Sequence, residues 1–187
     1  MKQEKICLVT GASGGIGRAI SRELASAGYT VILQGRDLDK LTDIRKELRY
    51  NSHIVCGDLT DENARNRILN EAFDYGDIEL LVNNAGISSF SDFQDLAKRE
   101  LVNLMDINLL SPMLFTHEFL KRLSPSKSTN TNKVKATIVN VGSAFGSIGY
   151  PGFSAYCASK FGLYGFTESL SRELADSNIR VAYFAPR

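Results

Sequence analysis

Tyr156 and Lys160 lie four residues apart in a segment of helical periodicity, so both side chains fall on one face of the expected helix. A tyrosine whose pKa is about 10 is a poor base at neutral pH. A neighbouring ammonium group favours the phenolate form of such a side chain. The pair can therefore protonate a developing alkoxide or remove the proton from an alcohol, which is general acid–base chemistry.

Ser143 follows a strand-like run at 136–141 and can present its hydroxyl beside Tyr156. Ligands of open α/β sheets bind at the carboxyl ends of the strands, where a hydroxyl can stabilise charge on a substrate oxygen. Ordinary structural roles are the alternative, because Tyr-x-x-x-Lys pairs are common and serine is a frequent turn residue. The catalytic interpretation requires these side chains to meet at one edge of a sheet.

A glycine-rich turn, Thr10 to Gly17 (TGASGGIG), separates a strand-like run from a helical segment. Glycine permits positive φ and close approach of a ligand to the backbone, and free amides at a helix N-terminus favour phosphate. Many turns are rich in glycine, but this one has the preceding strand and following helix of a dinucleotide site. The turn therefore predicts a bound dinucleotide.

Short β-branched runs alternate with longer helical segments along the chain. Strands are expected at 5–10, 30–34, 53–56, 78–83, 136–141 and 179–184, and helices after the glycine turn and at about 61–73, 92–123 and 154–175. Another helix is capped by Asp37 and has Leu38, Leu41, Ile44 and Leu48 on its buried side. This alternation predicts an α/β fold, a doubly wound Rossmann-like parallel sheet of about six strands in an α/β/α sandwich. The polar stretch 124–135 is expected to be a mobile surface loop.

The composition excludes several classes of protein. With 22 basic and 21 acidic residues, the chain has no charge excess to attract nucleic acid or an anionic membrane. No apolar run approaches the roughly 20 residues that span a bilayer, and the start of the chain leaves no room for a signal peptide. Cys7, Cys56 and Cys157 are odd in number and lack metal-ligand spacing. We therefore expect free thiols, no metal site and a cytoplasmic location.

Taken together, these motifs resemble those of the short-chain dehydrogenase/reductase family. Gly11, Gly15 and Gly17 match its Thr-Gly-x-x-x-Gly-x-Gly pattern, although Gly11, Gly14 and Gly17 also fit the extended, epimerase-like branch. Further motifs match the ordinary reductase branch in order and spacing: Asp58-Leu59, Asn83-Asn84-Ala85-Gly86, Asn108, Ser143 and Tyr156-x-x-x-Lys160. The resemblance covers essentially the whole chain.

The resemblance implies an oxidoreductase that interconverts a carbonyl compound and its alcohol by hydride transfer. The catalytic set that it implies is Asn108, Ser143, Tyr156 and Lys160. The cofactor-binding set that it implies is Gly11, Ser13, Gly15, Ile16, Gly17, Arg36, Asp58, Leu59, Asn84, Ala85, Gly86, Tyr156 and Lys160. Asn108 would hold a water that links Lys160 to solvent; by itself it also fits a helix cap or a buried structural amide.

The end of the second expected strand predicts which nicotinamide cofactor binds. NAD-dependent enzymes usually place an acidic residue there to accept from the ribose hydroxyls. By the resemblance that position is Gly35, and the following Arg36 can grip a 2′-phosphate with two N–H donors. NADP(H) is therefore favoured over NAD(H), with Arg36 on a solvated loop as the alternative. Gly14 weakens the preference, because many NADP-preferring relatives carry a basic residue there.

Two segments suggest the substrate and the assembly. The apolar, aromatic run 144–153 suits a hydrophobic carbonyl compound, although folding against the next helix explains it nearly as well. Gly162 and Gly165 within the helix at 154–175 indicate close packing. The resemblance implies a homodimer or tetramer through this helix and the segment 92–123; a contact within the monomer is the alternative.

The chain departs from the family pattern at its end. Family members usually continue past the sixth strand, whereas this sequence stops at Arg187, the position of a family glycine. We therefore expect residues 1–187 to form one dinucleotide-binding domain that lacks the usual substrate loop. The alternative to an active enzyme is a truncated or degenerate homologue that binds nucleotide, or a full-length relative, without turnover.

Overall fold

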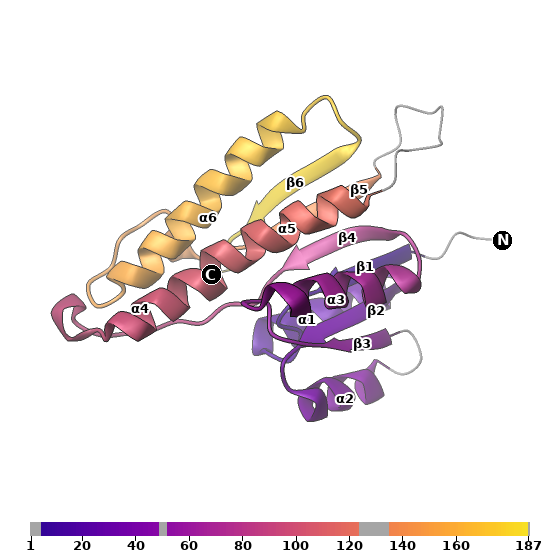
Figure 1. Ribbon diagram of the computed structural model, residues 1–187, viewed down its shortest axis with the longest axis horizontal. Helices are drawn as coiled ribbons and strands as arrows, with labels where there is room; N and C mark the ends of the chain where they lie inside the picture. Colours follow the sequence, from indigo (N-terminus) through magenta and orange to yellow (C-terminus); the bar gives the residue numbers. More distant parts are fainter. Residues whose placement is uncertain (1–4, 49–51, 124–134, 187) are drawn as a thin grey trace.

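The computed structural model describes residues 5–48, 52–123 and 135–186. Within these residues one parallel sheet has the strand order β3-β2-β1-β4-β5-β6 (Figure 1). Its strands are β1 (Lys5–Val9), β2 (Tyr29–Gly35), β3 (Ser52–Cys56), β4 (Ile78–Asn83), β5 (Ala136–Val141) and β6 (Ile179–Phe184). The order reverses between β1 and β4, which is where a doubly wound sheet binds its ligand.

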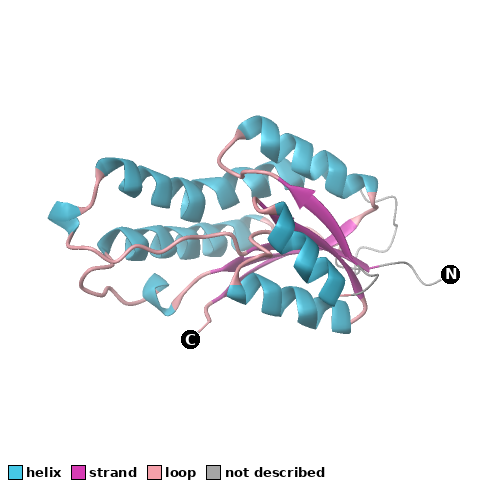
Figure 2. Ribbon diagram, turned by 90° about the horizontal axis from the view of Figure 1, so that it is seen from below, coloured by secondary structure: helices cyan, strands magenta, loops and turns pink. Residues whose placement is uncertain are grey.

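Helices cover both faces of the sheet, as Figure 2 shows. They are α1 (Gly15–Ser26), α2 (Leu38–Glu47), α3 (Glu62–Asp74), α4 (Lys98–Met105), α5 (Ser111–Arg122) and α6 (Ser154–Glu173). The predicted fold class, an α/β/α sandwich around a parallel sheet, is confirmed. No helix in the described part of the chain has the length and apolar character needed to cross a membrane.

The core has two layers because the central strands are covered on both faces. Ile6 and Leu8 of β1 pack with residues of α3 and α5, including the fully buried Phe115. The alternate residues Cys7 and Val9 pack on the other face, among residues of α1 and α2. Strands buried on both faces are near-continuously hydrophobic, which explains the sequence pattern of β1.

Local signals predicted most element boundaries to within a few residues. Asp37 caps α2 as expected, because its side chain accepts a hydrogen bond from the Lys40 amide at 3.1 Å. Leu41 and Ile44 are buried, but the expected burial of Leu38 is wrong. Leu38 is the first residue of α2, just beyond the carboxyl end of β2, and its side chain is exposed. The expected loop at 124–135 lies outside the described residues except for Lys135.

The expected helical segment at 92–123 contains several distinct elements. A short 3₁₀ turn, η1 (Phe93–Asp95), precedes α4, and a π-helical turn, η2 (Asp106–Leu110), joins α4 to α5. π-helical turns within longer helices occur frequently at functional sites. In Figure 1, α4 and the first turns of α6 extend beyond the carboxyl ends of the strands. The first turns of α6 carry Tyr156 and Lys160, so both residues are placed at this edge of the sheet.

Candidate active site

The glycine-rich turn packs directly against the end of β4. Gly11 has φ of 61°, and a Cβ there would lie 2.7 Å from the Cα of Ala85. A Cβ on Gly17 would overlap the Gly11 carbonyl oxygen and lie 2.7 Å from Nδ2 of Asn84. In contrast, a Cβ on Gly15 would meet nothing within 4 Å. Gly11 and Gly17 therefore let the turn close, whereas Gly15 leaves open space in front of the backbone.

Two polar side chains hold the turn on β4. The Thr10 hydroxyl accepts hydrogen bonds from the amides of Asn84 and Ala85, at 2.9 and 3.1 Å. The Asn84 side chain donates to the carbonyl oxygens of Thr10 and Gly11, at 3.0 and 3.1 Å. Asn84, one of the predicted cofactor residues, thus shapes the turn through its side chain.

The N-terminus of α1 is suited to binding an anion. Its N-cap is Gly14, with no side-chain cap hydrogen bond and no acidic residue in the first turn. By contrast, α2 and α3 are capped by the carboxylates of Asp37 and Asp61. Uncapped amides and the positive end of the helix dipole both favour a phosphate group. These residues therefore fit the pyrophosphate of a dinucleotide.

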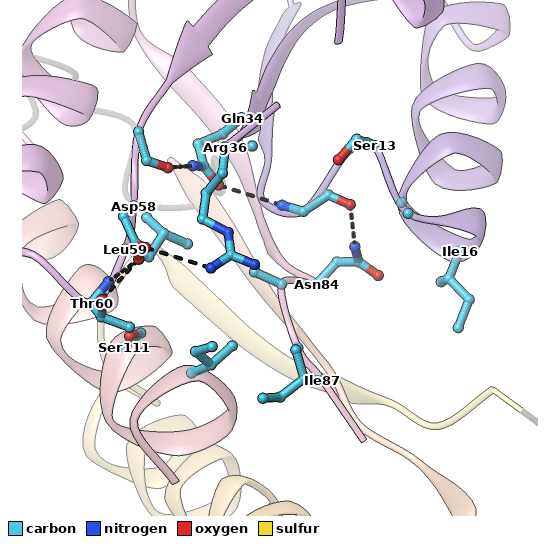
Figure 3. Close-up of a pocket in the computed structure, with 18 of the residues that line it drawn as sticks. Ser13, Ile16, Gln34, Arg36, Asp58, Leu59, Thr60, Asn84, Ile87 and Ser111 are labelled. Carbon is cyan, nitrogen blue, oxygen red and sulfur yellow. Dashed lines mark hydrogen bonds and ion pairs between the residues drawn. The ribbon is translucent and has the colours of Figure 1, made fainter. Parts of the chain in front are cut away.

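A cleft of about 480 Å³ opens above this turn (Figure 3). All the predicted cofactor residues line it except Tyr156 and Lys160. The lining also includes residues outside the predicted set: Gly14, Gln34, Gly35, Gly57, Thr60, Ile87, Ile107 and Ser111. Five of these, Gly57, Thr60, Ile87, Ile107 and Ser111, lie in the loops after β3 and β4 or in the helical segment after α4. These segments meet at the cleft only in the folded chain, so spacing along the sequence could not identify these five residues.

Arg36 extends from the end of β2 across one end of the cleft toward Asp58 (Figure 3). The guanidinium Nη1 lies 3.6 Å from Oδ2 of Asp58, and both side chains are substantially exposed. Burial opposes ionisation of Asp58, but hydrogen bonds from Thr60 and the charge of Arg36 outweigh it and hold the pKa of Asp58 below its usual value. The guanidinium is thus directed into the cleft and remains accessible to a ligand.

Gln34 is a cleft residue for which the sequence offers only a weak signal. It is 1% exposed in the otherwise apolar strand β2. Its Oε1 accepts from the Gly11 amide at 3.4 Å, and its Nε2 donates to the Gly57 carbonyl at 2.8 Å. This amide therefore joins the glycine-rich turn to the loop after β3. The signal in the sequence was a single amide residue within a hydrophobic run.

Lys160 lies between the cleft and Tyr156. Its side chain is buried, and its Nζ donates to the Val141 carbonyl at 3.1 Å. The same nitrogen is 5.8 Å from the centre of the Tyr156 ring. It also lies 3.6 Å from where a Cβ on the cleft residue Gly86 would stand. Burial lowers the pKa of Lys160 to about 8.

Asn108 is buried in the π-helical turn η2 and bridges two elements of the site. Its Oδ1 accepts from the Ile87 amide, and its Nδ2 donates to the Ile87 carbonyl, both at 2.8 Å. Its Nδ2 also lies 3.1 Å from the Ser159 hydroxyl on α6. The side chain thus connects the loop after β4, beside the cleft, to the helix that carries Tyr156 and Lys160.

Ser143 begins a short 3₁₀ turn, η3 (Ala144–Gly146), immediately after β5. Its Oγ accepts from the Phe145 amide at 3.2 Å. The rings of Phe145 and Phe153 lie edge-on or tilted to Tyr156, with centroids 6.3 and 6.1 Å away. The region around the phenol is therefore both apolar and aromatic.

A buried chain of amides supports this region. Asn83 at the end of β4 donates to Oδ1 of Asn140 on β5 at 2.8 Å. Asn140 in turn donates to the Thr167 hydroxyl on α6 at 2.9 Å. The two asparagines are register partners in adjacent strands. Each stands near the carboxyl end of an apolar strand, which was the signal in the sequence.

The fold and the cleft place the chain among dinucleotide-binding proteins, and comparison with known proteins narrows the class. The short chain dehydrogenase family matches residues 5–187. The chain is 35% identical over 189 residues to 3-oxoacyl-[acyl-carrier-protein] reductase FabG of Aquifex aeolicus, covering 98% of this chain and 73% of that protein. It is also 35% identical over 180 residues to nodulation protein G of Rhizobium meliloti, covering 96% and 71%.

Solved structures agree with the sequence comparison. A short-chain dehydrogenase from Streptomyces avermitilis superposes with a TM-score of 0.90 at 31% identity, over 100% of this chain and 66% of that one. A variant actinorhodin polyketide ketoreductase, solved with NADPH, gives a TM-score of 0.88 at 29% identity, over 98% and 70%. The chain belongs to the short-chain dehydrogenase/reductase family of oxidoreductases. It spans roughly seven-tenths of the length of these relatives.

Proposed function

We propose that this protein is an NADP(H)-dependent oxidoreductase that interconverts a carbonyl compound and its alcohol, with Tyr156 as the acid/base. The observation that carries the proposal is the position of Lys160. Its buried ammonium nitrogen lies beside Gly86 at the cleft wall and 5.8 Å from the Tyr156 ring. The positive charge of Lys160 can therefore act both on a cofactor in the cleft and on the Tyr156 phenol.

The cleft has groups suited to each charged part of NADP(H). The free amides at the start of α1 would hold the pyrophosphate, and Asp58 and Leu59 line the end expected to receive adenine. Arg36 would bind the 2′-phosphate, exchanging its exposed ion pair with Asp58 for a phosphate. A metagenomic short-chain oxidoreductase solved in complex with NADP, 30% identical with a TM-score of 0.87, supports this choice.

The protein's residues supply the proton chemistry, and the bound nicotinamide would supply or accept the hydride. In the reducing direction, the Ser143 hydroxyl holds the substrate oxygen, and Tyr156 donates its proton to that oxygen as negative charge develops. The Lys160 ammonium stabilises the resulting phenolate, and low solvent exposure strengthens this interaction. Asn108 holds the water through which Lys160 exchanges protons with solvent. In the oxidising direction the same residues act in reverse.

The surroundings of Tyr156 favour an apolar carbonyl substrate. Phe145 and Phe153 contact its ring, and Tyr150 stacks on Phe145 with centroids 5.4 Å apart. Relatives named as a 3-oxoacyl-[acyl-carrier-protein] reductase and a polyketide ketoreductase support carbonyl reduction as the reaction. Ketones, aldehydes and oxoacyl thioesters are therefore the substrates to test.

NADPH titration followed by turnover assays tests the proposal. We expect saturable quenching of protein fluorescence or enhancement of cofactor fluorescence on adding NADPH to the 187-residue chain. We then expect loss of NADPH absorbance that depends on a member of the carbonyl panel. Binding without turnover across the panel would instead identify a nucleotide-binding homologue. Absence of binding would refute both functions.

The assembly we propose is a homodimer or tetramer through α4, α5 and α6. Val102, Leu110 and Phe161 expose large apolar side chains on these helices and the connecting η2. Gly162 packs within the chain, because a Cβ there would lie 2.9 Å from Leu109, whereas a Cβ on Gly165 would meet nothing within 4 Å.

Light scattering tests the assembly directly. We expect a mass of at least twice 20.6 kDa for the wild-type chain. The Val102→Glu/Phe161→Glu variant should be monomeric, because it places charges on the faces of α4 and α6 proposed to pack against a second copy. A monomeric wild-type protein would contradict this assembly.

A further inference from the structure

Tyr183 of β6 has its hydroxyl at the backbone of Ser143. The hydroxyl oxygen accepts a hydrogen bond from the Ser143 amide at 3.3 Å. It also lies 3.5 Å from the carbonyl oxygens of Ser143 and Lys160, to which it can donate. One phenol therefore connects three elements: β6, the turn that begins at Ser143, and the helix α6.

Two glycines accommodate the side chain of Tyr183. A Cβ on Gly142 would overlap its ring, and a Cβ on Gly146 would overlap its hydroxyl oxygen. Neither glycine has positive φ, so backbone conformation does not require glycine at these positions. The absent side chains therefore provide the volume that the Tyr183 ring and hydroxyl occupy.

These contacts immobilise Ser143 from several directions. Its amide donates to Tyr183, its Oγ accepts from the Phe145 amide, and its carbonyl accepts from the Gly146 amide at 2.9 Å. With its heavy atoms held in this way, the Ser143 hydroxyl oxygen has a defined position from which it can donate to a substrate oxygen. Preorganised donors of this kind are effective because they need no rearrangement during reaction.

The phenol of Tyr183 is suited to remain neutral. Burial raises its pKa and outweighs the opposing hydrogen bond from Ser143, and the phenols of Tyr156 and Tyr164 raise it further. A neutral phenol can accept from the Ser143 amide while donating to a carbonyl, whereas a phenolate can only accept.

We infer that Tyr183 is a positioning residue, which holds Ser143 at a set place relative to the helix that carries Tyr156 and Lys160. This inference rests on the proposed function for its catalytic consequence, but the structural restraint can be measured independently. Tyr183 itself does not touch the reacting atoms in this scheme. It acts through Ser143.

Amide hydrogen exchange tests the restraint without any substrate. Tyr183→Phe keeps the ring and removes the hydroxyl, so the Ser143 amide should exchange about three- to tenfold faster, the range expected for losing one hydrogen bond. Tyr164→Phe is the matched control, because its ring lies 5.2 Å from that of Tyr183 and its side chain is partly exposed. In Tyr164→Phe the Ser143 amide should exchange at the wild-type rate. In both variants the amides of β1 should also exchange at the wild-type rate. Unchanged exchange at Ser143 in Tyr183→Phe would overturn the inference.

Kinetics then test the consequence for catalysis. With an accepted carbonyl substrate, Tyr183→Phe should lower kcat about three- to tenfold, leaving the Kd for NADPH unchanged. In a Ser143→Ala background, the same substitution should have no further effect on kcat, because Tyr183 acts through Ser143. An undiminished effect in that background would refute the role. If the wild-type chain binds NADPH without turnover, the proposed function fails, while the exchange measurement still decides the restraint.

Discussion

The cofactor cleft and the region around Tyr156 are built in different ways. The cleft is an open surface formed largely by backbone, in which missing side chains at Gly11 and Gly17 let the turn close on β4. Around Tyr156 the site is formed by buried polar side chains, such as Asn108 and Lys160, with hydrogen bonds between distant segments. The difference predicts that substitutions at the cleft glycines act through shape and those around Tyr156 through charge and proton position.

Replacing Tyr156, the proposed acid/base residue, should have the largest effect. Tyr156→Phe removes only the hydroxyl, so we expect turnover to fall by about 10²- to 10⁴-fold while the Kd for NADPH changes little. Steady-state kinetics and a fluorescence titration measure the two quantities. Tyr75→Phe, at the end of α3, is the matched control and should retain full activity. Comparable turnover in Tyr156→Phe would remove this residue from the mechanism.

The buried charge of Lys160 should make stability depend on pH. Its folded pKa of about 8 lies below the ordinary value of 10.5, so between these values the unfolded chain binds more protons than the folded chain. The free energy of unfolding of the wild type should therefore rise with pH across this window. The rise should exceed that of Lys160→Met by about 3 kcal/mol.

Urea unfolding at pH 7 and pH 10 measures this difference. Lys121→Met, at an exposed position on α5, is the control and should parallel the wild type at both pH values. If the free energy of unfolding of Lys160→Met also changed with pH in parallel with the wild type, the Lys160 ammonium would not be destabilised by burial.

In the cleft, two glycine substitutions should distinguish the glycine needed for folding of the turn from the glycine that leaves room for the ligand. Gly17→Ala places a methyl group against the Gly11 carbonyl and Asn84, so we expect a loss of about 1–3 kcal/mol in the free energy of unfolding. Gly15→Ala places its methyl group in open space and should change stability by no more than about 0.5 kcal/mol. Its effect should be confined to weaker NADPH binding. Equal stability losses would contradict the described packing of the turn.

The smallest expected effect concerns the choice between cofactors. Arg36→Ala removes the guanidinium proposed to bind the 2′-phosphate, so the ratio of NADH to NADPH dissociation constants should fall about tenfold, or about 1.4 kcal/mol. Affinity for NADH should change little, which provides an internal control. Arg36→Lys should be intermediate, because it retains the charge without the two-pronged donor. An unchanged ratio would place the phosphate contact elsewhere.

The fold was predictable because its signals are local. Apolar runs and helical periodicity located the strands and helices, and Asp37 marked the start of α2 correctly. The π-helical turn was not predicted, since an additional residue in a helical turn leaves little trace in an apolar pattern. Leu38 was misassigned because periodicity identifies a helical face but not where the sheet beneath it ends.

Within the site, the sequence indicated residues that carry a recognisable spacing. The glycine turn and the Tyr156–Lys160 pair belong to this group, and their neighbours in the chain reveal them. Gln34, Asn140 and Tyr183 carry no such spacing. Their roles depend on strands and loops that are far apart in the chain, so they emerged only when the tertiary contacts were known.

The amino-acid sequence by itself determined the alternation of strands and helices and the glycine-rich turn before α1. It also determined that Tyr156 and Lys160 lie one helical turn apart. Each depends on backbone preferences and side-chain periodicity over a few residues. Only the tertiary structure decided that Arg36 faces Asp58, that Asn108 joins the loop after β4 to α6, and that a tyrosine on β6 contacts Ser143. Those contacts are set by strand register and by the packing of helices on the sheet, which bring distant residues within hydrogen-bonding distance.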